Sequence, residues 1–374
     1  MRRVLSALVT VGVIVSTTSA CSEQAPAAGD SGQPTVVVTT NILGDVVSNL
    51  TGGVVDVVTI MPVGADPHEF QASARQADAI RSADALIVNG AGFEEGLLDV
   101  IEGAEADGVA VFEAIRAVRS IEFDDDHDSA TEHADEDHGD HDDEDHGDHE
   151  DEDHGDHDDE DHGDHDDEDH GDHDDEDHGD HEDEDHGDHD DAHGHDGTDP
   201  HFFTDPARMA VVVHAIADFL IDEVDGIDTV AVEAAADAYE RELDALDAEI
   251  ADLLAAIPSP RRVLVTNHEV FGYFAERYGF DVVGAIIPGG STTDGASAAA
   301  LAALAETIRD TGVTVIFADV SSSTDLAQTL ADEVGDIEIV ELYSESLGGA
   351  GSDGATYVEM IRTNAERITA ALAS

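Results

Sequence analysis

A long tract of almost nothing but Asp, Glu, His and Gly, residues 124–196, sets the first limit on what this chain can fold into. It contains 42 acidic residues and no basic ones, and from His138 the unit His-Gly-Asp-His-Asp-Asp-Glu-Asp repeats six times with little variation. Because the tract has almost no apolar side chains to bury and its charges repel one another, we expect it to be disordered without a ligand. Any packed core must therefore come from the two segments that flank it.

The tract also concentrates metal-binding groups, since 18 of the 22 histidines of the chain fall within it. Imidazole and carboxylate donors at this density bind borderline divalent metals such as Zn²⁺, weakly at each site but many at once. The alternative is a solvated polyelectrolyte linker. A flexible strand makes a poor selective site, so we expect the principal site elsewhere and treat the tract as auxiliary. Its repeating histidines are His138, His141, His146, His149, His154, His157, His162, His165, His170, His173, His178, His181, His186 and His189.

Charge and length limit the class of protein further. The 374 residues carry a formal net charge of −76, and the 14 basic residues are all Arg. An acidic surface of this kind repels nucleic acid and anionic membrane faces and attracts cations. We therefore expect no nucleic-acid partner, and a chain of this length has room for two domains of ordinary size.

The N-terminus has the features of an export signal. Arg2 and Arg3 precede an apolar run over 4–15, which is too short to span a membrane, and small residues lead to Cys21. Cys21 is the only cysteine, so no intrachain disulfide can form. Its position resembles a bacterial lipoprotein junction, which predicts a membrane tether through lipid on Cys21, with a plain secreted form as the alternative. The protein is then exported, either anchored on the outer face of the cytoplasmic membrane or periplasmic.

Strand and helix patterns alternate through both flanking segments. Near-continuous apolar runs such as 35–40 and 313–320 are typical of buried parallel strands, and Asn41 is predicted to cap the first helix. Apolar positions that alternate in steps of four and three from Val232 to Ile257 predict one long helix, ended by Pro258. The fold class is therefore α/β, with two doubly wound lobes joined by one long rigid helix and a cleft between the lobes. The predicted divisions are a signal peptide (1–21), a flexible linker (22–33), an N-terminal lobe (34–123), the acidic loop (124–198), the end of the N-terminal lobe (199–226), the linking helix (227–258) and a C-terminal lobe (259–374).

Four histidines lie outside the tract, and three of them occupy short loops. His268 directly follows a predicted strand, His68 lies in a loop past the carboxyl end of another, and His201 stands just before a predicted helix. The carboxyl ends of parallel strands are where open α/β sheets bind ligands. His214 instead falls within an apolar helical stretch, which favours a packed or hydrogen-bonded side chain. Since Glu345 also follows a strand, four donors from two lobes are expected to converge in the cleft.

Several segments, taken in order, resemble the zinc/manganese substrate-binding proteins of ABC importers. They are Gly-Ala-Asp-Pro-His-Glu-Phe at 64–70, a His- and Asp-rich insertion, Asp-Pro-His at 199–201, Asn-His-Glu at 267–269 and Tyr-Ser-Glu-Ser-Leu at 343–347. In that family, two lobes joined by one rigid helix hold a metal ion between them. The resemblance implies that the chain is a monomer that delivers its ion to an ABC permease and its ATPase.

The resemblance also implies the ligands His68, His201, His268 and Glu345, although the family more often has Asp at the last position. Asp319 lies at a strand end too, but the motif match favours Glu345. Three imidazoles and one carboxylate suit tetrahedral Zn²⁺ better than Mn²⁺. The candidates for carboxylates that orient the imidazoles are Asp66, Glu69 and Asp205.

Three other classes remain open. A manganese- or iron-binding homologue has the same fold, and a metal-buffering or adhesin lipoprotein shares the acidic tract. A zinc hydrolase needs an open coordination position and a general base. The sequence has no His-Glu-x-x-His helix and no arrangement of Ser or Cys nucleophiles. We therefore predict a binding protein with no enzymatic activity.

Overall fold

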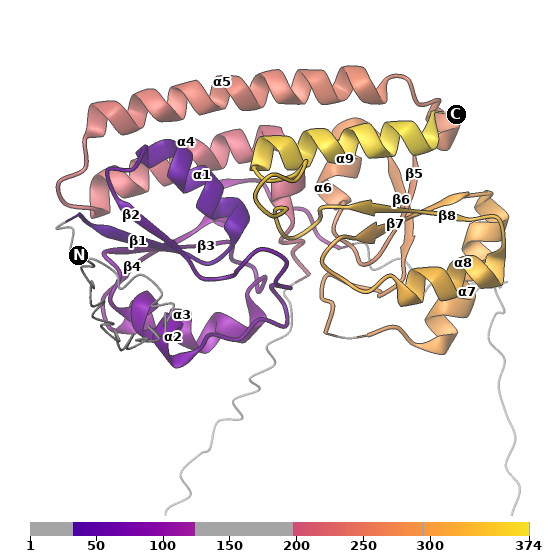
Figure 1. The fold of residues 1–374 in the computed structure, drawn as a ribbon, viewed down its shortest axis with the longest axis horizontal. Helices are drawn as coiled ribbons and strands as arrows, with labels where there is room; N and C mark the ends of the chain where they lie inside the picture. Colours follow the sequence, from indigo (N-terminus) through magenta and orange to yellow (C-terminus); the bar gives the residue numbers. More distant parts are fainter. Residues whose placement is uncertain (1–32, 124–196, 294, 374) are drawn as a thin grey trace, which may run out of the picture. The chain divides into compact units, whose positions relative to one another are not determined.

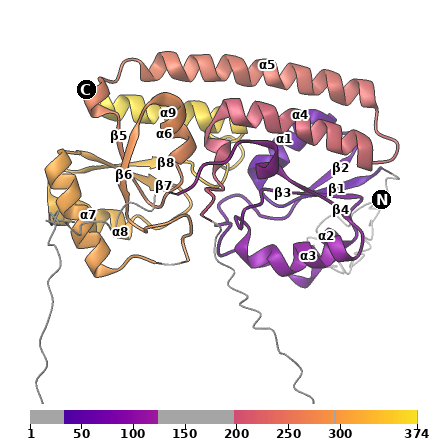
Figure 2. The same cartoon turned by 180° about the vertical axis from the view of Figure 1, so that it is seen from behind.

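The computed structural model describes residues 33–123, 197–293 and 295–373, and these build two lobes, each around a four-stranded parallel sheet (Figure 1). Helices cover both faces of each sheet (Figures 1 and 2). The predicted α/β class with two doubly wound lobes is therefore confirmed. Parallel strands need helical crossovers, so the alternation of strand and helix in the sequence has this architecture as its natural result.

The N-terminal lobe has the strand order β2-β1-β3-β4, and β1 is one of the two inner strands of the sheet. Val36, Val37 and Val38 of β1 are completely inaccessible to solvent, because helices pack on both sides of the strand. The elements are β1 (Thr35–Val38), α1 (Asn41–Thr51), β2 (Asp56–Thr59), α2 (Ala74–Arg81), β3 (Ala85–Val88), η1 (Glu95–Leu97), α3 (Leu98–Ala106), β4 (Ala110–Glu113), η2 (Ala114–Ala117), η4 (Phe202–Thr204) and α4 (Pro206–Glu223).

The C-terminal lobe repeats this arrangement with the order β6-β5-β7-β8. Its elements are η5 (Ser259–Arg261), β5 (Val263–Thr266), α6 (Gly272–Tyr278), β6 (Asp281–Ala285), α7 (Ala298–Thr311), β7 (Val315–Asp319), α8 (Asp325–Val334), β8 (Glu338–Leu342) and α9 (Tyr357–Leu372).

One long helix, α5 (Thr229–Leu254), connects the lobes, and it packs on α1 and α4 of the first lobe and on α9 of the second (Figures 1 and 2). Its buried seam agrees with the predicted steps of four and three as far as Ile250. The predicted seam position at Leu253 is wrong, since Leu254 is buried and Leu253 is only half-buried. A helix with 3.6 residues per turn drifts from a strict seven-residue repeat, so the last contact moves one position on. Ile257, the last predicted position, is buried but lies beyond the end of the helix.

The first helix begins one residue earlier than predicted. Thr40, not Asn41, is the N-cap of α1, and its Oγ1 accepts a hydrogen bond from the backbone N–H of Leu43 at 3.2 Å. Asn41 instead reaches the C-terminal lobe. Its Nδ2 donates to Ser346 Oγ at 2.9 Å, and its Oδ1 accepts from the backbone N–H of Leu347 at 2.7 Å. The prediction failed because Thr and Asn are both good N-cap residues, and the sequence does not show which of the two side chains hydrogen-bonds to the other lobe.

The residues that flank the acidic tract lie side by side. Glu122 and Thr198 form an isolated antiparallel bridge, and the backbone N–H of Phe123 donates to Gly197 O at 2.8 Å. Thr198, the predicted end of the acidic loop, takes part in this bridge. Residues 124–196, with the predicted auxiliary histidines, lie outside the described residues, as do Cys21 and the export signal. Within the described ranges, no helix combines the length and the apolar character needed to cross a membrane.

Gly96 is required where η1 meets the loop that carries His68. A Cβ at Gly96 would lie 2.2 Å from the backbone O of Phe70, so Gly96→Ala must push this loop away. We expect a loss of about 1–3 kcal/mol in the free energy of unfolding, measured by urea denaturation. Gly103→Ala in α3 is the matched control, because its Cβ meets nothing closer than 3.9 Å and it should stabilise by about 0.5–1 kcal/mol. A Gly96→Ala protein as stable as the original would show that the loop yields freely.

Candidate metal centre

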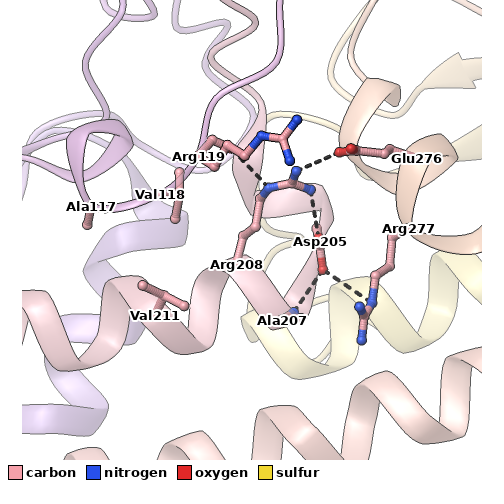
Figure 3. Close-up of a pocket in the computed structure, with 9 residues that line it drawn as sticks. All are labelled: Ala117, Val118, Arg119, Asp205, Ala207, Arg208, Val211, Glu276 and Arg277. Carbon is pink, nitrogen blue, oxygen red and sulfur yellow. Dashed lines mark hydrogen bonds and ion pairs between the residues drawn. The ribbon is translucent and has the colours of Figure 1, made fainter.

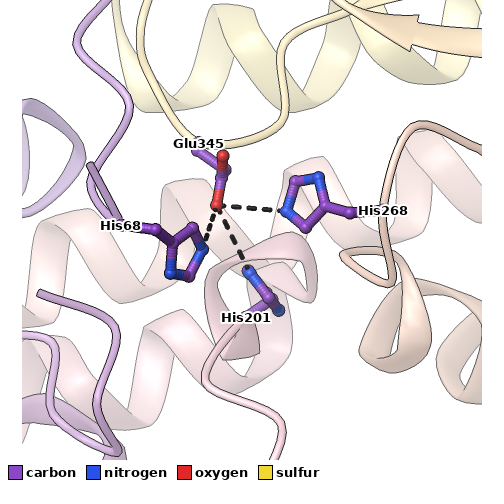
Figure 4. A group of neighbouring side chains, drawn as sticks. All are labelled: His68, His201, His268 and Glu345. Atoms are coloured by element: carbon purple, nitrogen blue, oxygen red, sulfur yellow. Dashed lines mark hydrogen bonds and ion pairs between the residues drawn. The ribbon is translucent and has the colours of Figure 1, made fainter. Parts of the chain in front are cut away.

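Four side chains from distant parts of the sequence meet at one buried point between the lobes (Figure 4). His68 follows β2, His268 follows β5 and Glu345 follows β8, whereas His201 is the N-cap residue of η4. Each is at most 3 % exposed. One ligand atom from each lies within 4.8 Å of the others. The structure thus brings together the four residues that the motif resemblance implied.

All three imidazoles present Nε2 to the same carboxylate oxygen. Glu345 Oε1 lies 2.8 Å from His68 Nε2, 3.1 Å from His268 Nε2 and 3.5 Å from His201 Nε2. Tetrahedral zinc with bonds of about 2 Å separates its donor atoms by roughly 3.3 Å. The three spacings to Glu345 Oε1 bracket that value, and all four donor atoms lie within 4.8 Å of one another, so an ion fits among them once the side chains draw together.

Two Asp-Pro-His segments place two of the rings by the same local geometry. Asp66 Oδ1 accepts from the backbone N–H of His68 at 2.9 Å, and Asp199 Oδ1 accepts from the backbone N–H of His201 at 2.9 Å. Side-chain acceptance two residues on is a frequent habit of Asp in turns. The intervening proline restricts the backbone further. The repeated Asp-Pro-His motif therefore encodes a rigid mount for each histidine.

The carboxylates on the far side of the rings differ from those predicted. Asp199 Oδ1 lies 2.8 Å from Nδ1 of His201, and Glu95 Oε1 lies 3.2 Å from Nδ1 of His68. Carboxylates at this position select the tautomer that leaves Nε2 free for a metal. The second Asp-Pro-His motif contained the signal for Asp199. Glu95 had no sequence signal, because it reaches His68 only through the packing of η1.

The three carboxylates predicted to orient the imidazoles have other surroundings. Asp66 holds the backbone of His68 rather than its ring, and its Oδ2 accepts from Thr292 Oγ1 of the other lobe at 2.7 Å. Glu69 is exposed to solvent. Asp205 is the N-cap of α4 and accepts from the backbone N–H of Ala207 at 2.9 Å.

Asp205 also belongs to a separate charged pocket of about 460 Å³ (Figure 3). There Arg208 donates to Asp205 Oδ2 at 2.9 Å and to Glu276 of α6, which ties the first lobe to the second. The pocket is lined by Ala117, Val118, Arg119, Asp205, Ala207, Arg208, Val211, Glu276 and Arg277, none of which belongs to the buried group.

His68, His201 and the carboxylate of the buried group shift one another's pKa values. Burial alone lowers the pKa of His201, but hydrogen bonds to Asp199 and Glu345 outweigh it and raise the pKa to about 9. Burial likewise opposes the charged form of His68, and its bond to Glu345 raises the pKa above the usual value. Burial would raise the pKa of Glu345, yet His268 and the other two imidazoles hold it well below the usual range. Before an ion binds, His68 and His201 therefore carry protons that an incoming cation must displace.

His214 lies away from this group. It is half-exposed on α4, and its Nε2 lies 3.0 Å from Glu240 of α5, with Asp237 nearby. Its side chain faces the carboxylate of Glu240 at the surface and is not packed in the core.

Comparison with known proteins identifies the family. The family model described as ZnuA, zinc-uptake complex component A, periplasmic, matches residues 36–371. The chain belongs to this family. Members of the ZnuA family are solute-binding proteins for metal transport, so the chain is a metal-binding, substrate-binding protein of an ABC transporter and not an enzyme.

Relatives of this ZnuA-family chain include proteins named for two different metals. The zinc-binding protein TroA of Treponema pallidum is 26 % identical over 99 % of this chain and 98 % of its own. The manganese-binding lipoprotein MntA of Halalkalibacterium halodurans is 23 % identical over 96 % of each chain. The solved structure of the periplasmic zinc-binding protein TroA from T. pallidum superposes with a TM-score of 0.68, at 26 % identity, covering 92 % of this chain and 100 % of that one. A Mn-bound periplasmic metal-binding protein from Candidatus Liberibacter asiaticus shares the fold, with a TM-score of 0.65 at 17 % identity and coverage of 91 % of this chain and 100 % of that one.

The proton on His201 makes the binding of a divalent metal ion pH-dependent. Because its pKa is about 9, we expect the apparent zinc affinity to rise with pH up to about that value. The slope should be roughly tenfold per pH unit for each proton displaced. Competition against a chelator of known protonation behaviour measures this. The stability of the metal-free protein should depend on pH in the opposite direction. The proton on His201 stabilises the fold at pH values below the ordinary histidine pKa, and this stability is lost as the pH rises through about 9. A zinc affinity independent of pH would contradict the expectation.

Proposed function

We propose that this protein is the extracytoplasmic zinc-binding component of an ABC importer, which captures Zn²⁺ and delivers it to a membrane permease driven by an ATPase. The observation that carries the proposal is the meeting of three imidazole Nε2 atoms around Glu345 Oε1, at 2.8–3.5 Å. Three neutral nitrogen donors and one carboxylate are a ligand set that zinc favours in tetrahedral geometry.

The donor set favours zinc over manganese. Mn²⁺ prefers carboxylate, carbonyl and water oxygens in larger coordination shells, whereas imidazole suits Zn²⁺. Among the described residues, only one carboxylate belongs to the group of four donors. A manganese- or iron-binding function is the second candidate, because MntA and several other relatives carry manganese in their names.

Capture and release follow from the division of the ligands between the lobes. His68 and His201 belong to the first lobe, and His268 and Glu345 to the second. Hydrogen bonds from Asn41 and from the backbone N–H of Gly64 to Ser346 hold the lobes together beside the site. Separating the lobes on a permease would break these bonds and divide the ligand set, which releases the ion. We propose that the protein acts as a monomer, tethered outside the cytoplasmic membrane through lipid on Cys21.

The proposal predicts one tight zinc site that depends on the buried histidines. His201→Ala should lower zinc affinity at least 100-fold, because it removes a ligand and leaves Asp199 and Glu345 without their shared partner. His214→Ala is the matched control, since that histidine is half-exposed and pairs with Glu240. Calorimetric titration is best done with residues 124–196 replaced by a short turn, which the bridge between Glu122 and Thr198 can accommodate.

The absence of a tight zinc site in the protein with an intact His201 would refute the proposal. A tight site that prefers Mn²⁺ over Zn²⁺ in competition would support the role in an ABC importer, with manganese instead of zinc as the transported metal.

We further propose that the acidic tract raises the local cation concentration for the buried site. Deleting residues 124–196 should then reduce zinc uptake by cells at scarce zinc and leave uptake at plentiful zinc unchanged. The affinity of the buried site is the control, and it should stay within about twofold of the full chain, because its four ligands lie outside the tract. Unchanged uptake at scarce zinc would exclude this capture role and favour the alternative, in which the tract senses zinc abundance.

A further inference from the structure

The three imidazoles of the buried group differ in what lies behind them. Nδ1 of His68 faces Glu95 at 3.2 Å, and Nδ1 of His201 faces Asp199 at 2.8 Å. His268 directs Nε2 to Glu345 as the others do, but its Nδ1 is buried without a hydrogen-bond partner. A neutral imidazole that gives Nε2 to a metal carries its proton on Nδ1. His268 therefore needs an acceptor, whereas Nδ1 of each of the other two rings already faces a carboxylate oxygen.

A buried acceptor without a partner stands on the neighbouring strand. Asp319 is 2 % exposed, its Oδ1 accepts from the backbone N–H and Oγ of Ser321, and its Oδ2 has no hydrogen bond. Buried polar atoms are rarely left unpaired in proteins, so two such atoms at one sheet edge call for an explanation.

Strand pairing brings these two residues to the same place. β5 and β7 are adjacent parallel strands, and Thr266 is the register partner of Phe317. His268 and Asp319 each lie two residues further along, at the carboxyl edge of the sheet. Adjacent strands run about 4.8 Å apart, so the side chains are within reach of one another or of one shared water molecule.

Electrostatics agrees with this placement. Burial and the nearby charge of Glu345 together raise the pKa of Asp319 to about 6, against the opposing effects of its hydrogen bonds to Ser321 and of the charge of His268. The carboxyl of Asp319 therefore lies within the field of both the imidazole and the carboxylate of the metal group.

We propose that Asp319 is the positioning carboxylate of His268. When zinc occupies Nε2 of His268, Oδ2 of Asp319 accepts the proton on Nδ1, directly or across one water molecule. Each imidazole then has its own carboxylate, Glu95 for His68, Asp199 for His201 and Asp319 for His268. This inference rests on the proposed zinc-binding function and adds a residue that the ligand group itself does not contain.

A direct role of Asp319 as a ligand is the competing explanation. The four donor atoms of the group lie within 4.8 Å of one another, and Asp319 does not belong to that set. Its Oδ1 is also held by Ser321, which turns the carboxylate toward its own loop. These contacts favour a role through His268 over a place on the metal.

Zinc affinity of the full-length protein tests the proposal, with free zinc buffered by a chelator at levels too low to fill weak sites. Asp319→Ala should lower the affinity 10–100-fold, the range typical for removal of a carboxylate behind a ligating histidine. Asp319→Asn, which keeps the shape and a neutral acceptor, should fall between this variant and the original. Asp281→Ala is the control, because Asp281 is exposed at the opposite end of the same sheet and should leave the affinity unchanged.

A double-mutant cycle with His268→Ala separates positioning from ligation. If Asp319 acts through His268, Asp319→Ala should cost nothing further in the His268→Ala background. Nitrogen-15 spectra of the zinc-loaded protein give a readout besides affinity, since the Nδ1 proton of His268 should exchange with water faster in Asp319→Ala. Equal losses in both backgrounds would overturn the proposal, and so would an Asp319→Ala affinity within twofold of the original. If the original protein itself does not bind zinc tightly, the proposed function is refuted. If the original protein binds zinc tightly but the Asp319 variants do not show the expected losses, only this inference is refuted.

Discussion

The arrangement of the metal centre depends on one buried carboxylate oxygen, Oε1 of Glu345. Three imidazole nitrogens approach it from two lobes. Ionised groups are unfavourable in an apolar interior unless they are paired, and here the pairing is supplied by rings attached to three separate loops. In the metal-free protein, protons on the imidazoles compensate the carboxylate. A divalent cation can replace those protons once the donor side chains draw together.

The surrounding fold holds these loops in place. His68, His268 and Glu345 follow parallel strands whose carboxyl ends meet at the sheet edges, where backbone groups no longer pair with a neighbouring strand and side chains are free to face a ligand. Rigid local turns add to this, since Asp66 and Asp199 each accept from the backbone N–H of the histidine two residues on. The long helix α5 packs on both lobes and limits how they can move against each other. A site preorganised in this way binds a small ion without first ordering a loop.

Polar contacts between the lobes surround the site. Asn41 and Gly64 bind Ser346, Thr292 binds Asp66, and Arg208 joins Asp205 to Glu276. These polar contacts are partly open to solvent. Apart from them, one apolar cluster continues from the first lobe through α4 and α5 to β5, α6 and α9 of the second. This shared core keeps the lobes joined and limits how far they can separate when the polar contacts beside the site open.

The sequence by itself determined the α/β class, the two lobes, the seam of α5 as far as Ile250 and the loops that carry His68, His201, His268 and Glu345. These features are local, because strand runs, helical periodicity and Asp-Pro-His turns depend on residues close together in the chain. Only the tertiary structure decided which carboxylates stand behind the rings. Glu95 and Asp319 reach the site through helix and strand packing, and Asn41 left the expected cap position for a partner 305 residues away. The docking of the two lobes sets these contacts, and it depends on the shapes of whole surfaces, which no short stretch of sequence contains.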